Sequence, residues 1–295
     1  MPAKLTRRDV IVRSLLAAPG LVYPWPSTAF AADAAAAKRL AALEKSHGGR
    51  LGISVLDVAG GGRVERRAHE RFPMCSTFKW LAAAFVLARV ERGEERLDRR
   101  VTFAKDDLVP YSPVTGEHTG PPGMTLEELC HAAVTVSDNA AANLLLASFG
   151  GPAALTQYAR SLGDEVTRLD RIEPGLNAAI PGDARDTTTP AAMTENVRRL
   201  VLGDALSATS RAKLTDWLVG NTTGDARLRA GFPKGWRVGD KTGSGNHGVT
   251  NDVAIAWPPG RQPIIVSAYY AESRADGDAR SAVLAEVARI ITAGG

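Results

Sequence analysis

The 295-residue chain has little cysteine, little net charge and no long apolar run. Because no stretch of eighteen or more residues is apolar, the sequence predicts no membrane span. The formal net charge of +4 at pH 7 would fall to about +1 without residues 1–31, which carry four basic side chains and one acidic one. So small an excess gives no reason to expect a nucleic-acid or anionic-membrane partner.

Only two cysteines are present, Cys75 and Cys130. Two cysteines in an exported chain invite a disulfide. Cys75, however, directly precedes the serine that we take below as a nucleophile, whereas Cys130 falls in a helical pattern elsewhere. We therefore expect two buried free thiols.

The five histidines show no zinc-ligand spacing such as H-E-x-x-H. They are His47, His69, His118, His131 and His247. We expect each to be a surface or loop residue, so the sequence predicts no metal site and no cofactor. This pattern argues against a metal-dependent hydrolase.

The first 31 residues are typical of an export signal. A basic start containing Arg7 and Arg8 is followed by an apolar stretch over residues 10–25 and by the small-x-small pattern Ala29-Phe30-Ala31. The arginine pair favours twin-arginine export, with the general secretory route as the alternative. We expect cleavage near Ala31 and a periplasmic or secreted protein.

Strand patterns lie toward both ends of the chain, and helical patterns fill its middle. The predicted strands are residues 51–58, 63–66, 236–241, 249–257 and 263–270. The predicted helices are residues 32–46, 78–90, 126–136, 139–149, 152–162, 190–202, 208–219 and 279–291. Residues 163–189 show no periodicity, and so long a loop in a compact domain is usually functional.

This arrangement predicts an α+β fold with a five-stranded antiparallel sheet flanked by the terminal helices. We expect one domain over residues 32–295. Its sheet sub-domain would comprise about 32–69 and 216–295, and its helical sub-domain about 70–215. The active site should lie between the two parts, since pockets favour such junctions.

Four short segments carry the chemistry. They are Ser76-Thr77-Phe78-Lys79, Ser137-Asp138-Asn139, the loop from Arg171 to Asn177 around Glu173, and Lys241-Thr242-Gly243. Each segment alone is weak evidence of function. Together they supply a nucleophile, a proton relay, a carboxylate for activating water and a cation for an anionic substrate. That set suits acyl transfer followed by hydrolysis.

Ser76 is the candidate nucleophile, since a serine hydroxyl reacts only with a base beside it. If Ser76 begins the apolar helix 78–90, Lys79 lies one turn further on the same face. Burial lowers the pKa of a lysine and makes it a plausible base. The alternative is a helix cap followed by a surface lysine, but a lysine in so apolar a helix needs a reason.

The four segments, in this order and at these separations, resemble the class A serine β-lactamases. The resemblance runs from about residue 35 to the C-terminus. It implies the β-lactamase/transpeptidase-like fold. It also implies hydrolysis of the β-lactam ring of penicillins and cephalosporins through a serine acyl-enzyme, and hence antibiotic resistance. The expected partners are small β-lactam substrates, and the family expectation is a monomer.

The resemblance assigns roles to the remaining residues. Ser137 would pass a proton to the departing lactam nitrogen, and Asn139 would bind the substrate's side-chain amide. Glu173 would activate the deacylating water with help from Asn177, although Ser137-Asp138-Asn139 could also be only a helix cap. Further implied contacts come from Lys241, Thr242 and Ser244 to the substrate carboxylate, from Tyr111 stacking on the substrate, and from an Arg171–Asp186 ion pair closing the loop.

The chain departs from the family pattern at two positions. Many members have a carboxylate-binding arginine where this chain has Thr250, and we expect Arg227 to replace it, with Arg280 as the weaker candidate. Some members carry a cleft disulfide whose second position here is Gly245, so that bridge is absent. Whether Lys79 or Glu173 is the base for acylation stays open.

Two other functions compete with hydrolysis. A penicillin-binding DD-peptidase shares the serine, lysine and K-T-G elements but lacks the loop with Glu173 and stays acylated. A non-catalytic β-lactam sensor is the second alternative. Glu173 in its motif favours the hydrolase.

Overall fold

The computed structural model describes residues 28–293, with side chains from residue 34 onward. A five-stranded antiparallel sheet forms its centre, in the order β2-β1-β9-β8-β7, and confirms the predicted fold. The strands are β1 (Arg50–Asp57), β2 (Arg63–Arg66), β7 (Arg237–Gly245), β8 (Val249–Trp257) and β9 (Ile264–Ala271). The N-terminal hairpin therefore pairs with the last strand of the chain.

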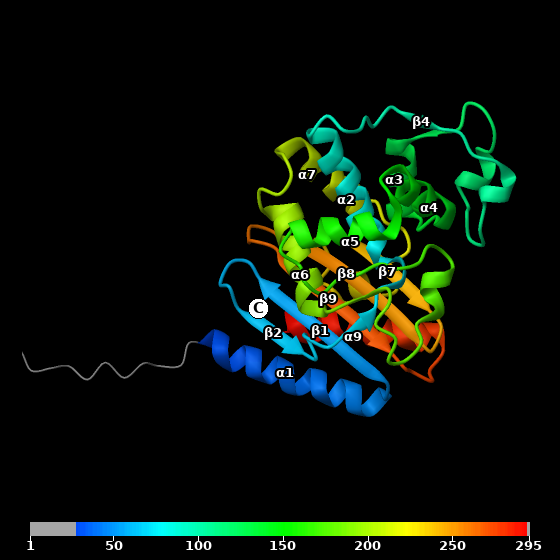
Figure 1. Cartoon of the computed structure of the whole chain (residues 1–295). Helices are drawn as coiled ribbons and strands as arrows, with labels where there is room; N and C mark the ends of the chain where they lie inside the picture. Colours follow the sequence, from blue (N-terminus) through cyan, green and yellow to red (C-terminus); the bar gives the residue numbers. More distant parts are fainter. Residues whose placement is uncertain (1–27, 294–295) are drawn as a thin grey trace, which may run out of the picture.

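Both faces of the sheet are covered, which is why β8 and β9 are buried almost throughout. The two terminal helices, α1 (Thr28–His47) and α9 (Gly277–Thr292), pack on one face, where Leu40, Ile53 and Leu284 share a core. The one-turn helix α8 (Leu228–Gly231) packs with α9 on this same face, and the larger helices of the middle of the chain lie on the opposite side (Figure 1). Apolar side chains removed from water on both faces stabilise this layered arrangement.

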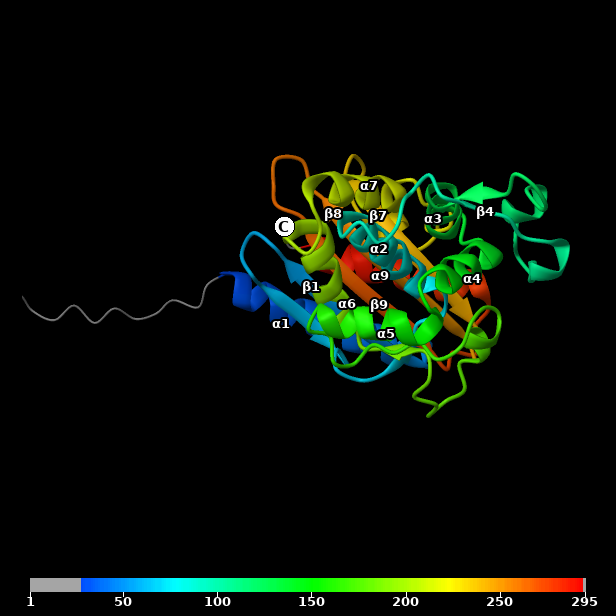
Figure 2. The same ribbon diagram turned by 45° about the horizontal axis from the view of Figure 1, so that its top comes forward.

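The helical layer surrounds α2 (Phe78–Glu91), whose residues from Phe78 to Ala88 are all buried. It also contains α3 (Leu126–Thr135), α4 (Asn139–Ser148), α5 (Gly151–Ser161), α6 (Pro190–Val197) and α7 (Ala208–Val219). The turned view shows α2 in the middle of this layer, next to α7 (Figure 2). Residues 78–90 are apolar nearly all round, which predicts a buried central helix, and α2 confirms it.

Smaller elements connect these layers. The short strand pairs are β3 (Phe72–Pro73) with β6 (Thr187–Thr188) and β4 (Arg100–Val101) with β5 (Met124–Thr125). Single turns of helix are η1 (Cys75–Thr77), η2 (Lys105–Asp107), η3 (Thr115–Glu117), η4 (Gly175–Ala178) and α8 (Leu228–Gly231). Sequence periodicity predicted none of them, since two to four residues are too few to show a period.

Most predicted elements differ from the structure by a residue or two, and three differ by four or more at one end. The first helix, predicted over 32–46, begins at Thr28. The helix predicted over residues 190–202 is α-helical only to Val197 and continues as the wider turn η5 (Arg198–Leu202). The strand predicted over 236–241 continues to Gly245 because Gly245 still pairs with Val249 of β8. Pairing with a neighbouring strand, rather than residue propensity, decides where such a strand ends.

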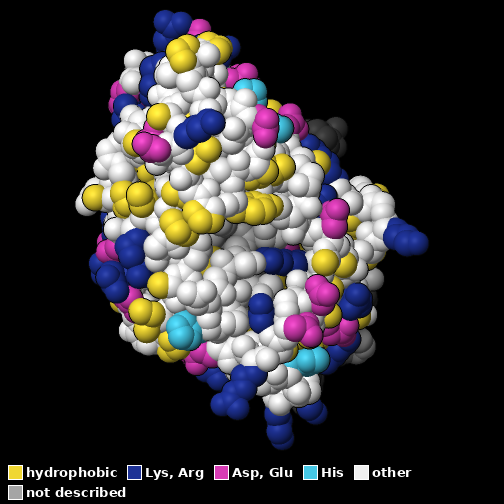
Figure 3. All heavy atoms as spheres, turned by 90° about the vertical axis from the view of Figure 1, so that its right-hand side faces the viewer, with side chains coloured by type: hydrophobic (Ala, Val, Ile, Leu, Met, Phe, Trp, Pro, Cys, Tyr) yellow, Lys and Arg dark blue, Asp and Glu magenta, His cyan; other side chains and the backbone are white. Residues whose placement is uncertain are grey.

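Within residues 28–293, no helix combines the length and the apolar character needed to cross a bilayer. Most of the predicted export signal lies outside the described residues, and its expected cleavage point falls in the first turn of α1. The edge of the molecule where β7 and the α3–α4 connection meet is at the right of Figure 1. Viewed from that side, the surface is hollowed and basic side chains lie at the hollow (Figure 3).

Candidate active site

Ser76 and Lys79 occupy the junction between η1 and α2, as their spacing predicted. Ser76 is partly exposed, whereas Lys79, one turn further along, is fully buried. The Thr77 hydroxyl donates to Met74 O at 2.8 Å and holds the turn before α2. The helix therefore presents a serine at the surface of the cleft and a lysine beneath it.

The Lys79 ammonium is surrounded by oxygen acceptors. Its Nζ donates to Ser137 O at 2.8 Å and to Asn139 Oδ1 at 2.5 Å, and lies 3.1 Å from Glu173 Oε1. Three acceptors match the three N–H groups of a protonated lysine. Burial lowers the pKa of Lys79, while the charge of Glu173 and its hydrogen bond act in the opposite direction.

Glu173 joins the nucleophile to the loop. Its side chain is buried, and Oε1 accepts a hydrogen bond from Ser76 Oγ at 3.1 Å. Its other oxygen, Oε2, accepts from Asn177 Nδ2 at 2.5 Å. The carboxylate that the sequence placed in a long loop therefore touches both Ser76 and Lys79.

Asn143 fixes the backbone of Glu173, and sequence reasoning missed it. Its Oδ1 accepts from Glu173 N and its Nδ2 donates to Glu173 O, both at 2.9 Å. The only sequence signal is an asparagine within the apolar helix α4. Such a paired contact satisfies both backbone groups and holds the carboxylate in place.

The loop is closed at its base as the resemblance implied. Arg171 and Asp186 form an ion pair, and Asp186 Oδ1 also accepts the backbone N–H groups of Asp170 and Arg171 at 2.7 and 2.9 Å. The Glu173–Pro174 peptide bond is cis. The catalytic candidate Glu173 thus lies between a closed loop base and the Asn143 clamp.

Ser137 lies between the two buried lysines. Lys241 Nζ donates to Ser137 Oγ at 3.0 Å, and Lys79 Nζ lies 3.4 Å from the same oxygen. Burial, together with the positive charge of Lys79, lowers the pKa of Lys241 well below its usual value. Ser137 adopts the left-handed conformation with φ 62°, which costs a non-glycine residue energy and is typical of functional positions.

Asp138 has the structural role that its position before α4 predicted. Its Oδ1 accepts from Ala141 N at 2.8 Å as the helix N-cap. Its Oδ2 accepts from the backbone N–H groups of Val114 and Thr115, both at 2.9 Å. Asp138 therefore joins α4 to the loop that carries Tyr111.

The cleft wall comes from that loop. The Tyr111 side chain is 60% exposed, and Tyr111 O accepts from Asn139 N at 3.0 Å. Asn139 Nδ2 donates to Pro110 O at 2.8 Å while its Oδ1 faces Lys79. Asn139 thus connects the exposed aromatic ring to the buried lysine.

Two arginines flank the end of β7. Arg227 donates to Gly243 O at 2.9 Å, and its second nitrogen donates to Ser244 Oγ at 2.7 Å. Arg280 donates to Thr250 Oγ1 at 2.9 Å, on the residue paired with Ser244 across β7 and β8. Both candidates reach this edge, and Arg227 contacts the predicted binding residue directly.

Glycines let β7 approach the nucleophile. A Cβ atom on Gly243 would lie 2.7 Å from Met74 O and 3.2 Å from Ser76 N. A Cβ atom on Gly245 would lie 2.6 Å from Cys75 Sγ.

Cys75 and Cys130 are both buried and free, which confirms the predicted thiols, and burial raises the pKa of each.

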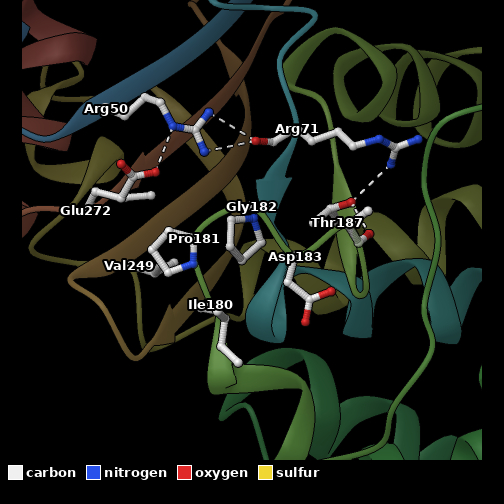
Figure 4. A pocket seen from close by; sticks show the side chains of 13 residues that line it. Arg50, Arg71, Ile180, Pro181, Gly182, Asp183, Thr187, Val249 and Glu272 are labelled. Atoms are coloured by element: carbon white, nitrogen blue, oxygen red, sulfur yellow. Dashed lines mark hydrogen bonds and ion pairs between the residues drawn. The ribbon is translucent and has the colours of Figure 1, made fainter.

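A separate cavity of about 130 Å³ lies behind the second half of the loop (Figure 4). Its lining includes Ile180, Pro181, Asp183, Arg50 and Glu272 but none of the reactive side chains. Arg50 Nε donates to Glu272 at 3.0 Å, and its terminal nitrogens reach Arg71 O. No group of three metal-ligating side chains occurs in the part of the chain that the structure describes.

The comparisons with known proteins agree with this geometry. The family model described as "Beta-lactamase enzyme family" matches residues 35–294. The chain is 51% identical to β-lactamase CTX-M-97 of Escherichia coli over 87% of this chain and 88% of that protein.

Solved structures are similar as well. An ancestral class A β-lactamase (GNCA) superposes with a TM-score of 0.87 at 64% identity, covering 88% of this chain and 100% of that one. The putative class A β-lactamase PenP from Rhodopseudomonas palustris gives a TM-score of 0.87 at 57% identity over 88% and 100%.

The fold and the match to the family model identify the class of protein, a β-lactamase with an active-site serine. The chain belongs to the class A serine β-lactamase family.

Proposed function

We propose that this enzyme hydrolyses the β-lactam ring of penicillins and cephalosporins through an acyl-enzyme on Ser76, and so gives antibiotic resistance. The observation that carries the proposal is the 3.1 Å hydrogen bond from Ser76 Oγ to the buried Glu173 Oε1. A serine hydroxyl on a carboxylate is an activated nucleophile.

Glu173 takes the Ser76 proton during acylation. Lys79 is poorly suited to that step in this geometry, since its three N–H groups all face oxygen acceptors. Its ammonium instead places a positive charge 3.1 Å from Glu173 Oε1. Backbone N–H groups of Ser76 and Ser244 receive the developing oxyanion, and one such donor contributes about 3–4 kcal/mol to the transition state.

Ser137 completes acylation by protonating the departing lactam nitrogen. Its hydroxyl is 3.0 Å from Lys241 Nζ and 3.4 Å from Lys79 Nζ, so a lysine proton can replace the one that it gives up. The C–N bond of the ring breaks as the nitrogen gains this proton. The product of this step is an ester on Ser76.

Hydrolysis of that ester uses Glu173 a second time, after its proton has passed to Lys79 Nζ, 3.1 Å away, and replaced the proton given to Ser137. Among the described residues, Asn177 Oδ1 is a buried acceptor without a partner, next to the Glu173 carboxylate that Asn177 Nδ2 contacts. A water donating to Asn177 Oδ1 and to Glu173 would be held beside Ser76, and Glu173 takes its proton as it attacks the ester carbonyl. The C–O bond to Ser76 then breaks, and Ser76 Oγ regains a proton from Glu173, 3.1 Å away. This second use of Glu173 separates a β-lactamase from an enzyme that stays acylated.

The substrate carboxylate binds at the end of β7. Lys241, Thr242 and Ser244 supply its donors, and Arg227 supports Ser244 through the 2.7 Å contact to Ser244 Oγ. Asn139 binds the substrate's side-chain amide, and Tyr111, exposed on the opposite wall, stacks on the substrate. These groups place the lactam carbonyl over Ser76.

We also propose that residues 1–31 are removed on export and that the mature chain, residues 32–295, acts as a monomer in the periplasm or outside the cell. It forms one domain with a sheet sub-domain of about 32–69 and 216–295 and a helical sub-domain of about 70–215. The site described above lies at their junction.

The test is hydrolysis of a chromogenic cephalosporin by the mature chain with EDTA present and no added metal. Sustained turnover that is lost in Ser76→Ala supports the proposal. A stoichiometric burst that then stops would indicate a penicillin-binding protein or sensor. Turnover retained by Ser76→Ala would contradict a serine acyl-enzyme.

A further inference from the structure

A row of hydrogen-bonded side chains connects Thr242 to the buried carboxylate of Asp240, two residues earlier on β7. Thr242 Oγ1 lies 2.5 Å from Thr223 Oγ1, which lies 2.8 Å from Asn221 Oδ1. Asn221 Nδ2 in turn donates to Asp240 Oδ2 at 2.6 Å. Thr242 is one of the residues proposed to bind the substrate carboxylate, so the direction of these hydrogen bonds affects binding.

The orientation of the Asn221 amide is fixed by a backbone group. The N–H of Thr223 can only donate, and it points at Asn221 Oδ1 at 3.2 Å. The oxygen therefore faces Thr223, and the Nδ2 group faces Asp240. Asp240 is suited to accept that contact, since its other oxygen pairs with Arg229.

The orientation of the Asn221 amide determines the atom to which each threonine hydroxyl donates its proton. Asn221 Oδ1 can only accept hydrogen bonds, so the Thr223 hydroxyl donates its single proton to Asn221 Oδ1. The short contact between the two threonines then requires Thr242 to be its donor. Thr242 has no proton left for a ligand and presents only lone pairs to the cleft.

We propose that Thr223 is a positioning residue that, in the free enzyme, turns the Thr242 hydroxyl proton away from the substrate carboxylate. The inference rests on the proposed function, in which Thr242 contacts that carboxylate. A carboxylate only accepts hydrogen bonds, so it binds Thr242 only after the bond from Thr242 to Thr223 breaks.

The arrangement favours a different ligand group. A primary amide in place of the carboxylate carries N–H donors, which match the lone pairs that Thr242 presents. Thr223 therefore reduces the preference of the site for carboxylate over carboxamide. Breaking one neutral hydrogen bond corresponds to roughly a fivefold change in affinity.

The experiment compares Thr223→Val with Thr223→Ser on a penicillin and on its carboxamide derivative. Thr223→Val removes the acceptor for the Thr242 proton at almost constant volume. We expect KM for the penicillin to fall roughly fivefold, KM for the carboxamide to stay level or rise, and kcat to change little. Thr223→Ser keeps the hydroxyl and should behave as the wild type.

Thermal unfolding of both variants and the Thr242→Val variant serve as controls. If Thr242→Val raises KM for the penicillin but Thr223→Val leaves it unchanged or raises it, the proposed direction of the hydrogen bonds is wrong and the carboxylate site stands. If Thr242→Val also leaves KM unchanged, the carboxylate site itself is wrong and this inference fails with it.

Discussion

Lys79 on α2 and Lys241 on β7 are both fully buried, and both lie near the Ser137 hydroxyl, yet their surroundings differ. Lys79 contacts the carboxylate of Glu173. Among the residues that the structure describes, Lys241 has only neutral partners within hydrogen-bond distance, Ser137 Oγ and Thr242 O, both at 3.0 Å. Burial lowers both pKa values, but that of Lys241 falls well below normal, with Lys79 adding to the fall.

The difference shows how one cleft uses two lysines for two purposes. The Glu173 carboxylate opposes the fall in the pKa of Lys79 and holds its ammonium beside the nucleophile. Lys241 lacks such a partner in the free enzyme, so an incoming substrate carboxylate can supply it. The helical side of the cleft is therefore complete before the substrate arrives, whereas the strand side is completed by the substrate.

The largest fall in kcat is expected for a substitution of Lys79, on the helical side of the cleft. Lys79→Met should lower kcat about 10²–10⁴-fold, the usual contribution of a positioned proton-transfer group, because Glu173 and Ser137 lose their shared cation. Steady-state kinetics with a penicillin measures this. Lys241→Met is the matched variant on the strand side, and an equal loss of kcat in it would show that the two lysines are not distinct.

Lys241→Met should act mainly on binding. We expect KM for carboxylate-bearing substrates to rise about tenfold to a hundredfold, as for loss of a hydrogen bond to a charged group, with a smaller change in kcat. Lys241→Arg keeps the charge and should recover part of the affinity. A KM that stays at the wild-type value in Lys241→Met would contradict the role given to this lysine.

The pH dependence sharpens the comparison further. Lys241 binds a carboxylate only while it is protonated, so KM should rise as pH increases through its lowered pKa, below the usual lysine value of 10.5. Part of the shift comes from the charge of Lys79. The rise in KM should therefore move to higher pH in Lys79→Met, measured under single-turnover conditions. An unmoved profile would mean that the two lysines do not interact.

The smallest expected change in KM comes from replacing either of the two arginines at the end of β7, and it distinguishes their roles. Arg227→Ala should raise KM for carboxylate substrates several-fold, since Arg227 contacts Ser244 directly. Arg280→Ala should change KM less, because Arg280 contacts Thr250 on the neighbouring strand. The reverse order would transfer the role to Arg280.

The sequence predicted the sheet and its five strands from local apolar patterns, and the central helix from a run that is apolar on all sides. It also predicted which residues would meet, through helical spacing for Ser76 and Lys79 and through the resemblance of whole motifs for the others. Asn143 and Thr223 could not be found in this way. Their importance comes from contacts across 30 and 19 positions of the chain, to Glu173 and Thr242, and no local pattern encodes such pairs.

The central claim is that Glu173 serves both acylation and hydrolysis, and Glu173→Gln tests it most directly. The variant should be mixed with a penicillin and followed by intact-protein mass spectrometry, with Ser76→Ala as the control that cannot acylate. We predict slowed acylation and then a persistent mass increase equal to the whole penicillin, because the ester forms but water is not activated. Steady turnover by Glu173→Gln without an accumulating acyl-enzyme would contradict the account.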